Sequence, residues 1–84
     1  ETLAVGRAMG LPLEIAVDER IAQTRCLGAI KTSMLQDAEA GRPVELQAVL
    51  GTVIELADWL AVPVPMSRAV HALARGRSSV LGLI

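Results

Sequence analysis

The chain has 84 residues, which suffice for one domain and leave no room for a separate nucleotide-binding domain. Its formal charge of −1, with acidic and basic residues intermixed, provides no strong field for a phosphate backbone or an anionic membrane, so nucleic acid is not a favoured partner. Hydrophobic residues make up 52% of the chain, yet it has one Trp and no Phe or Tyr. We therefore expect an aliphatic core and some apolar surface that a partner or a missing neighbour covers.

The sequence gives few indications of cellular location. No charged and apolar leader opens the chain, and no run approaches 18 uncharged apolar residues, so neither secretion nor a membrane span is indicated. The single Cys26 allows no internal disulfide and no cysteine-based zinc site, which fits a reducing, cytoplasmic setting. Because the chain begins inside a helix-like pattern at Glu1 and without Met, we expect it to be truncated.

Helical periodicity begins with the first residues, and strand-like alternation is nowhere sustained. Gly10 and Pro12 end the first predicted helix. Asp18 is the expected N-cap of a second helix that runs to about Ile30. The residues expected to face inward on these two helices are Leu3, Ala4, Val5, Ala8, Met9, Ile21, Ala22, Cys26, Ala29 and Ile30.

A short third helix is predicted to begin at Thr32 or Ser33 and to stop at Gly41. Pro43 suits the first turn of a fourth helix, predicted from about Val44 to Ala61. Polar residues of that helix form one narrow stripe, so we expect neighbours to cover its other sides, as in a central bundle helix. The stripe consists of Gln47, Gly51, Glu55 and Asp58; Met34, Leu35 and Ala38 line the third helix, and Trp59 is expected in the core or at its edge.

Pro63 and Pro65 interrupt the helical pattern, and a fifth helix is predicted from about Met66 to Arg75, before Gly76. Residues 76–84 are open to three interpretations: a short helix on the bundle, a disordered end, or a strip that contacts another subunit. The predicted fold is therefore all-α, a single bundle of about five helices. The inward residues expected on the fifth helix are Met66, Val70 and Leu73.

Two side chains around the third helix could contribute to a site. Ser33 has a local interpretation as the cap of its own first turn, which the sequence alone favours, and a functional one, in which its hydroxyl helps bind the carboxylate of a small ligand. Glu45 lies roughly 120° from the polar stripe on a helical wheel, toward the covered side. It could reach water, cap the helix or face a ligand, and the first two are favoured. Lys31 is expected to be solvated, and His71 lacks a second metal ligand at suitable spacing.

The segment KTSMLQDAEAGRPVEL, Lys31 to Leu46, resembles the signature of the C-terminal domain of ketopantoate reductases (2-dehydropantoate 2-reductases) almost position by position. The family pattern has Thr-Ser-Met, Gln-Asp, a small loop with Gly-Arg-Pro, then Glu and an aliphatic residue. The later AVPVPMSRAVHAL is similar to the family's paired-proline turn and last core helix.

The resemblance implies that residues 1–84 are part of the C-terminal helical substrate and dimerisation domain of a 6-phosphogluconate-dehydrogenase-like reductase of pantothenate biosynthesis. An N-terminal Rossmann domain that holds NADPH would be absent from this chain, and a 2-keto acid substrate and a homodimer are the implied partners. Ser33 matches the residue that contacts substrate, and Glu45 the residue near the nicotinamide ribose. The implied fragment is inactive alone.

Two features depart from the family. Its catalytic Lys and substrate-binding Asn residues lie upstream and have no counterpart here, so no catalytic residue is assigned in this chain and Lys31 is not promoted to that role. After the Glu, the family often has Asp and then Asn before Gly, whereas this chain has Gln47 and Leu50 before Gly51. These substitutions put ketopantoate itself in doubt as the substrate.

Two other function classes have some support in the sequence. A helix-turn-helix over residues 55–77 is opposed by Pro63 and Pro65 in the turn and by the acidic net charge. A helical protein-protein interaction or dimerisation module without catalysis fits the apolar composition and can coexist with the reductase interpretation.

Overall fold

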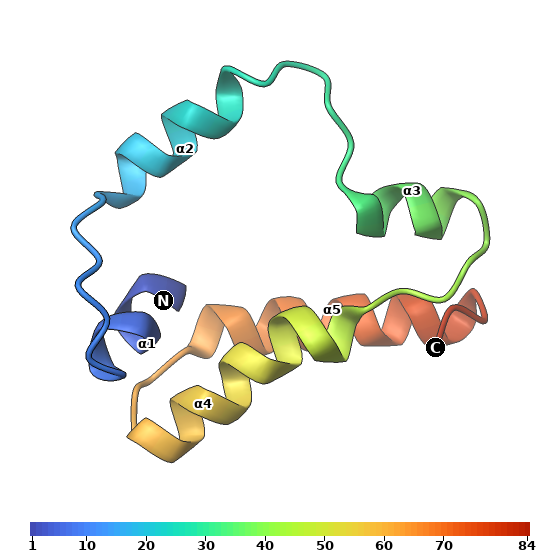
Figure 1. Cartoon of the computed structure of the whole chain (residues 1–84). Helices are drawn as coiled ribbons and strands as arrows, with labels where there is room; N and C mark the ends of the chain where they lie inside the picture. Colours follow the sequence, from blue (N-terminus) through green and yellow to red (C-terminus); the bar gives the residue numbers. More distant parts are fainter.

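The computed structural model describes residues 1–84 and contains helices only (Figure 1). The predicted all-α class with five helices is confirmed. No helix combines the length and the apolar run that crossing a membrane requires. The elements are α1 (Thr2–Ala8), α2 (Val17–Arg25), α3 (Ser33–Glu39), the π-helical turn η1 (Gln47–Gly51), α4 (Thr52–Leu60) and α5 (Pro65–Val80).

Helix α2 differs from its prediction at both ends and on its inward face. It begins after Ala16, so Asp18 lies within the first turn, where its carboxylate is favoured by the positive end of the helix dipole. It ends at Arg25 instead of Ile30, ahead of Gly28 with its left-handed φ of 68°. None of its residues is buried, so Ile21 and the other residues predicted to face inward are exposed. Figure 1 shows the reason: α2 stands apart between two extended connections.

The predicted fourth helix corresponds to η1 and α4 together, which form one continuous helical rod. This rod starts at Leu46, and Pro43 therefore lies in the preceding loop and not in the first turn. Its C-terminal residue Ala61 takes a left-handed conformation, with φ of 56°. Trp59, two residues earlier, was predicted in the core or at its edge. Instead 87% of its surface is exposed, because nothing in this chain covers that side of α4.

Helix α5 runs five residues beyond its predicted end. A glycine inside a helix destabilises it by only about 1 kcal/mol, and Gly76 is tolerated within the sixteen-residue helix. The helix ends instead at Val80, ahead of Gly82, whose φ is 71°. There the N–H of Leu83 donates to the carbonyl of Ser78 at 2.8 Å, which closes the final turn. Residues 76–84 are thus ordered, and Leu83 is buried against the rest of the chain.

The buried core is small and lies where α1 crosses α4. Its centre consists of Val5 from α1, Ala57 from α4 and Val64 from the loop before α5. Ala57 is completely buried, which lets the two helices approach closely. Partly buried side chains surround this centre: Val53, Ile54, Leu56 and Val62. The first helix thus contributes Val5 to the core as predicted, whereas Ala4, Ala8 and Met9 are exposed.

The inward face of α5 is displaced from the predicted one by one residue, or about 100° around the helix. Met66, Val70 and Leu73 are all more than half exposed. The covered side carries small and polar residues at helical spacing: Ser67, His71, Ala74 and Ser78. Hydrophobic periodicity located an apolar stripe correctly, but this chain holds no element that packs on that stripe.

The surface area shows how incomplete the packing is. A compact protein of this mass exposes about 4,800 Å², whereas this chain exposes 6220 Å². Its radius of gyration is 14.4 Å, against about 12 Å for a compact domain of equal length. Many large apolar side chains contribute to this surface, among them Met66, Val70 and Leu73 of α5.

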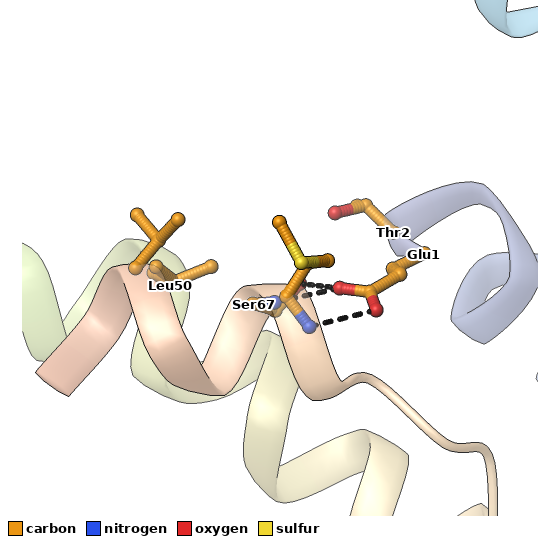
Figure 2. A pocket seen from close by; sticks show the side chains of 6 residues that line it. Glu1, Thr2, Leu50 and Ser67 are labelled. Carbon is orange, nitrogen blue, oxygen red and sulfur yellow. Dashed lines mark hydrogen bonds between the residues drawn. The ribbon is translucent and has the colours of Figure 1, made fainter.

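Glu1 connects α1 to the start of α5, a role that the sequence did not reveal. Its carboxylate accepts hydrogen bonds from the N–H of Met66 at 3.0 Å and from the N–H and hydroxyl of Ser67 at 2.6 and 2.7 Å (Figure 2). The residue before α5, Val64, has no side chain that could cap these groups. A carboxylate 65 positions earlier in the chain supplies the cap instead.

This cap predicts a pH dependence of stability. The hydrogen bond from the Ser67 hydroxyl, followed by those from the two N–H groups, lowers the pKa of the Glu1 carboxyl below its ordinary 4.5. The stabilisation is therefore complete above pH 4.5 and is lost as the pH falls through the lowered folded-state pKa. Thermal unfolding can be measured between about pH 3 and 7, the range in which carboxyl groups titrate. Glu1→Gln should lower the melting temperature at neutral pH and should reduce the decrease in melting temperature between neutral and acidic pH. Glu19→Gln is the control, and an identical pH profile for both variants would contradict the assignment.

Candidate functional site

The two residues singled out from the sequence line one hollow between the start of α3 and the residues that lead into η1. Its volume is about 320 Å³. Ser33 contributes from the first turn of α3, and Glu45 faces it from the segment that follows the turn at Gly41. The other residues of the lining are Thr32, Met34, Asp37 and Val49.

The turn at Gly41 brings Glu45 back toward Ser33. Gly41 adopts a φ of 72°, and the N–H of Arg42 donates to the carbonyl of Asp37 at 2.8 Å. This arrangement ends α3, as predicted, and reverses the chain. The thirteen residues from Ser33 to Glu45 thus form a helix and a return loop, and both side chains line the same hollow.

Thr32, and not Ser33, caps α3. The hydroxyl oxygen of Thr32 accepts a hydrogen bond from the N–H of Leu35 at 3.2 Å. Thr32 was one of two candidates for the helix start, and the capping role that the local sequence favoured for Ser33 is wrong. Ser33 is exposed in the first turn and its hydroxyl forms no hydrogen bond within the chain. It is free to bond a molecule in the hollow.

Glu45 does not lie on the covered side that the helical wheel predicted. The wheel assumed an uninterrupted α-helix from Val44, but the helical rod begins at Leu46, so Glu45 lies in the preceding loop. The π turn η1 also contains one extra residue, which rotates the residues before it by about 100° relative to α4. Glu45 is exposed, and no side-chain bond caps the rod at this end. Of its three interpretations, capping is therefore wrong, and the carboxylate borders an open hollow.

Asp37 is a polar residue of the hollow that the sequence analysis did not single out. Its carboxylate pairs with Arg42, with 2.9 Å between Oδ1 and Nε. This pair reinforces the backbone bond that reverses the chain. The signal that could have identified Asp37 is its position four residues after Ser33, because residues at that spacing share one face of a helix.

The electrostatic character of the hollow favours groups that donate hydrogen bonds. Its lining holds two carboxylates and two hydroxyls but no Lys, Arg or His. An ionised carboxylate only accepts hydrogen bonds, so Glu45 suits the hydroxyl groups of a ligand. Lys31 is turned to a different partner, the carboxylate of Glu39, at 2.7 Å, and both side chains are exposed. A cation that would bind a substrate carboxylate is not supplied by this lining.

The remaining ionisable residues do not form a second site of this kind. No three His, Cys, Asp or Glu side chains gather as a metal ion would require. Cys26 is exposed and not, as predicted, a buried small hydrophobe, because α2 packs on nothing in this chain. His71 is half-buried and contacts the side chain of Gln47.

Comparison with known proteins assigns the fold described above to a family. Residues 1–78 match the family described as "Ketopantoate reductase PanE/ApbA C terminal". The chain belongs to this ketopantoate reductase C-terminal family. The resemblance inferred from the segment Lys31 to Leu46 is thereby confirmed, and the family match includes α1 and nearly all of α5.

A curated relative in the family is a 2-dehydropantoate 2-reductase of Mesorhizobium japonicum (strain LMG 29417 / CECT 9101 / MAFF 303099). It is 44% identical to this chain over 75 residues, which are 89% of the chain and 23% of the relative. The chain thus spans about a quarter of that reductase's length. No solved structure matches the chain.

Stability measurements can distinguish the different roles of Thr32 and Ser33 in this member of the ketopantoate reductase C-terminal family. Thr32→Ala removes the α3 cap and should lower the free energy of unfolding by about 1 kcal/mol. Ser33→Ala removes a hydroxyl without a partner and should change it by less than about 0.5 kcal/mol. Urea unfolding followed by circular dichroism measures both. A larger loss for Ser33→Ala than for Thr32→Ala would show that Ser33 is the cap.

Proposed function

We propose that this chain is part of the C-terminal helical domain of an NADPH-dependent 2-dehydropantoate 2-reductase-like oxidoreductase, and that it closes over a 2-keto acid substrate. The observation that carries the proposal is the shared hollow of Ser33 and Glu45, which are also the two family-matching residues. The longer protein that contains the chain, the parent, would supply the N-terminal Rossmann domain, which is the part that holds NADPH.

Ser33 is proposed to orient the substrate. Its hydroxyl is exposed in the hollow and is not used for capping, so bonding a ligand would break no bond of the folded chain. A hydroxyl both donates and accepts, and it can bond a carboxylate or a carbonyl oxygen of a keto acid. Because the lining carries no cation, the substrate's negative charge would be met by residues of the parent, such as the family's upstream Lys.

Glu45 is proposed to position the cofactor or the substrate. Its carboxylate has no internal partner and borders the open side of the hollow, where it could accept hydrogen bonds from the hydroxyls of the nicotinamide ribose. These free acceptors fit a polyhydroxylated group better than an anionic one. When bound, NADPH supplies the hydride, and this chain's residues act by orientation and electrostatics.

The proposal assigns no catalytic turnover to the chain alone. The cofactor domain and the catalytic Lys expected from the family lie outside these residues, and the chain has about a quarter of the length of its relative. The identity of the keto acid is set partly by residues that follow Glu45. Gln47 and Leu50 depart from the family's usual Asp and Asn, so ketopantoate is the first substrate to assay and related 2-keto acids follow.

Steady-state kinetics of the parent with NADPH and ketopantoate test these roles. Glu45→Ala removes a charge-assisted hydrogen bond and should lower kcat/KM about 10- to 100-fold, and Ser33→Ala about 2- to 10-fold. Ser79→Ala and Glu19→Gln, at exposed positions away from the hollow, are matched controls that should stay within about twofold of the parent. Full activity in both Ser33→Ala and Glu45→Ala would exclude the proposed roles.

The exposed stripe of α5 supports a second role, that of an interaction surface between two copies of the protein. Met66, Val70, Leu73 and Val80 follow one another at helical spacing, and each is more than half exposed. Contiguous apolar side chains on one helix are costly to leave in water, and a homodimer is a common way to bury such a face.

Light scattering on the purified parent tests the dimer. Replacement of both Val70 and Leu73 by Asp puts two charges into the stripe and should convert a dimer into a monomer, because burying unpaired charges is unfavourable. Two Asp substitutions at Gln23 and Ala69, which are also exposed, serve as the control for added charge. A parent that is monomeric at high concentration contradicts the homodimer and leaves the rest of its own polypeptide to cover the stripe.

A further inference from the structure

The side chain of Gln47 joins three helical segments next to the candidate site. Its Oε1 lies 3.2 Å from Nε2 of His71 on α5, and its Nε2 donates to Oε1 of Glu55 on α4 at 3.3 Å. Gln47 itself is the first residue of the π turn η1. One amide group thus connects the π turn both to α4, which continues from it, and to α5, which packs against it.

Gly51 makes room for this bridge. It is buried at the end of the π turn, and a Cβ atom at this position would overlap with the amide group of Gln47. The side chain of Gln47 therefore lies across a surface that only glycine leaves open. The polar stripe noted in the sequence, with Gln47, Gly51 and Glu55 on one side of the helix, is in this structure a hydrogen-bonded connection.

The main chain of Gln47 is held as well. Its carbonyl oxygen accepts the N–H of Thr52, the bond that defines a π turn, and the Thr52 hydroxyl donates to the same oxygen at 3.4 Å. Isolated π turns are rare within α-helices, since they give up the regular α-helical bonding pattern, and they occur frequently at functional sites. This turn begins two residues after Glu45 and includes Val49, and both of these side chains line the hollow.

We propose that Gln47 is a positioning residue for Glu45: its bridge to His71 and Glu55 holds the π turn that directs the Glu45 carboxylate into the hollow. This inference rests on the function proposed above for Glu45. If η1 relaxed to a regular α-helix, the residues before it would rotate by about 100° relative to α4. Glu45 would then leave the side that faces Ser33. Gln47 departs from the family's usual Asp, and in this chain its role is to hold the π turn.

A double-mutant cycle on the parent tests the inference. Gln47→Ala should lower kcat/KM for NADPH-dependent ketopantoate reduction about tenfold, as expected when a remote change misplaces a contact of the transition state. In the Glu45→Ala background the same substitution should have no further effect, because the group that it positions is gone. Additive losses, or no loss for Gln47→Ala in a parent that needs Glu45, would overturn the inference.

Arg68→Ala is the matched control for simple loosening of the two helices. Arg68 pairs with Asp58 and also connects α5 to α4, but far from the π turn. It should leave kcat/KM within about twofold, and its effect should be the same with and without Glu45. If Arg68→Ala reproduced the Gln47→Ala pattern, the cause would be loss of the α4–α5 connection and not a change in the orientation of Glu45.

A second pair of variants covers the case in which Gln47→Ala fails to fold. His71→Leu removes one arm of the bridge, whereas His71→Gln retains a donor for Gln47. We expect an intermediate loss of about threefold for the first, within the range for one neutral hydrogen bond, and recovery for the second. Equal activities of the two variants would contradict the inference.

A crystal structure of the Gln47→Ala parent separates this inference from the proposed function. If the unmodified parent reduces no 2-keto acid, or if Glu45→Ala is fully active, the proposed function fails. The positioning inference is then judged by the structure alone. A π turn retained at residues 47–51, with Glu45 still facing Ser33, would overturn it, whereas a regular α-helix with Glu45 rotated away supports it.

Discussion

The contact between α1 and α4 at Ala57 is the interaction on which the packed part of the molecule depends. Ala57 is small enough for the helices to meet, and Val5 and Val64 close the contact from either side. Because α1 is fixed there, Glu1 reaches the first turn of α5 and caps it. The order of α5 therefore follows from a packing contact on another helix, as well as from its own sequence.

The candidate site depends on a different constraint, the chain reversal after α3. The left-handed turn at Gly41 and the Asp37–Arg42 pair bring the chain back beside α3. The N–H of Val44 then donates to the carbonyl of Leu83 at 3.0 Å, which attaches the returning segment to the end of α5. These local devices position Ser33 and Glu45 on the hollow without using the core.

The sequence predicted what local chemistry determines and missed what long-range packing determines. The helix count and the end of α3 at Gly41 follow from periodicity and backbone preference, and both were predictable. The exposed face of α5 and of Trp59 could not be predicted, because periodicity identifies an apolar stripe but not whether a partner for it is present in the chain. The position of Glu45 was not predicted because a helical wheel assumes regular α-helical spacing. The rod begins only at Leu46 and contains a π turn, and the sequence pattern indicates neither feature.

The isolation of α2 has a consequence for how sequence changes in this region act. None of its residues is buried, and two extended segments connect it to α1 and α3 (Figure 1). A substitution at Ile21 is therefore not expected to change the packing of α1, α4 and α5. This helix can therefore vary in sequence during evolution while the packed helices keep their arrangement.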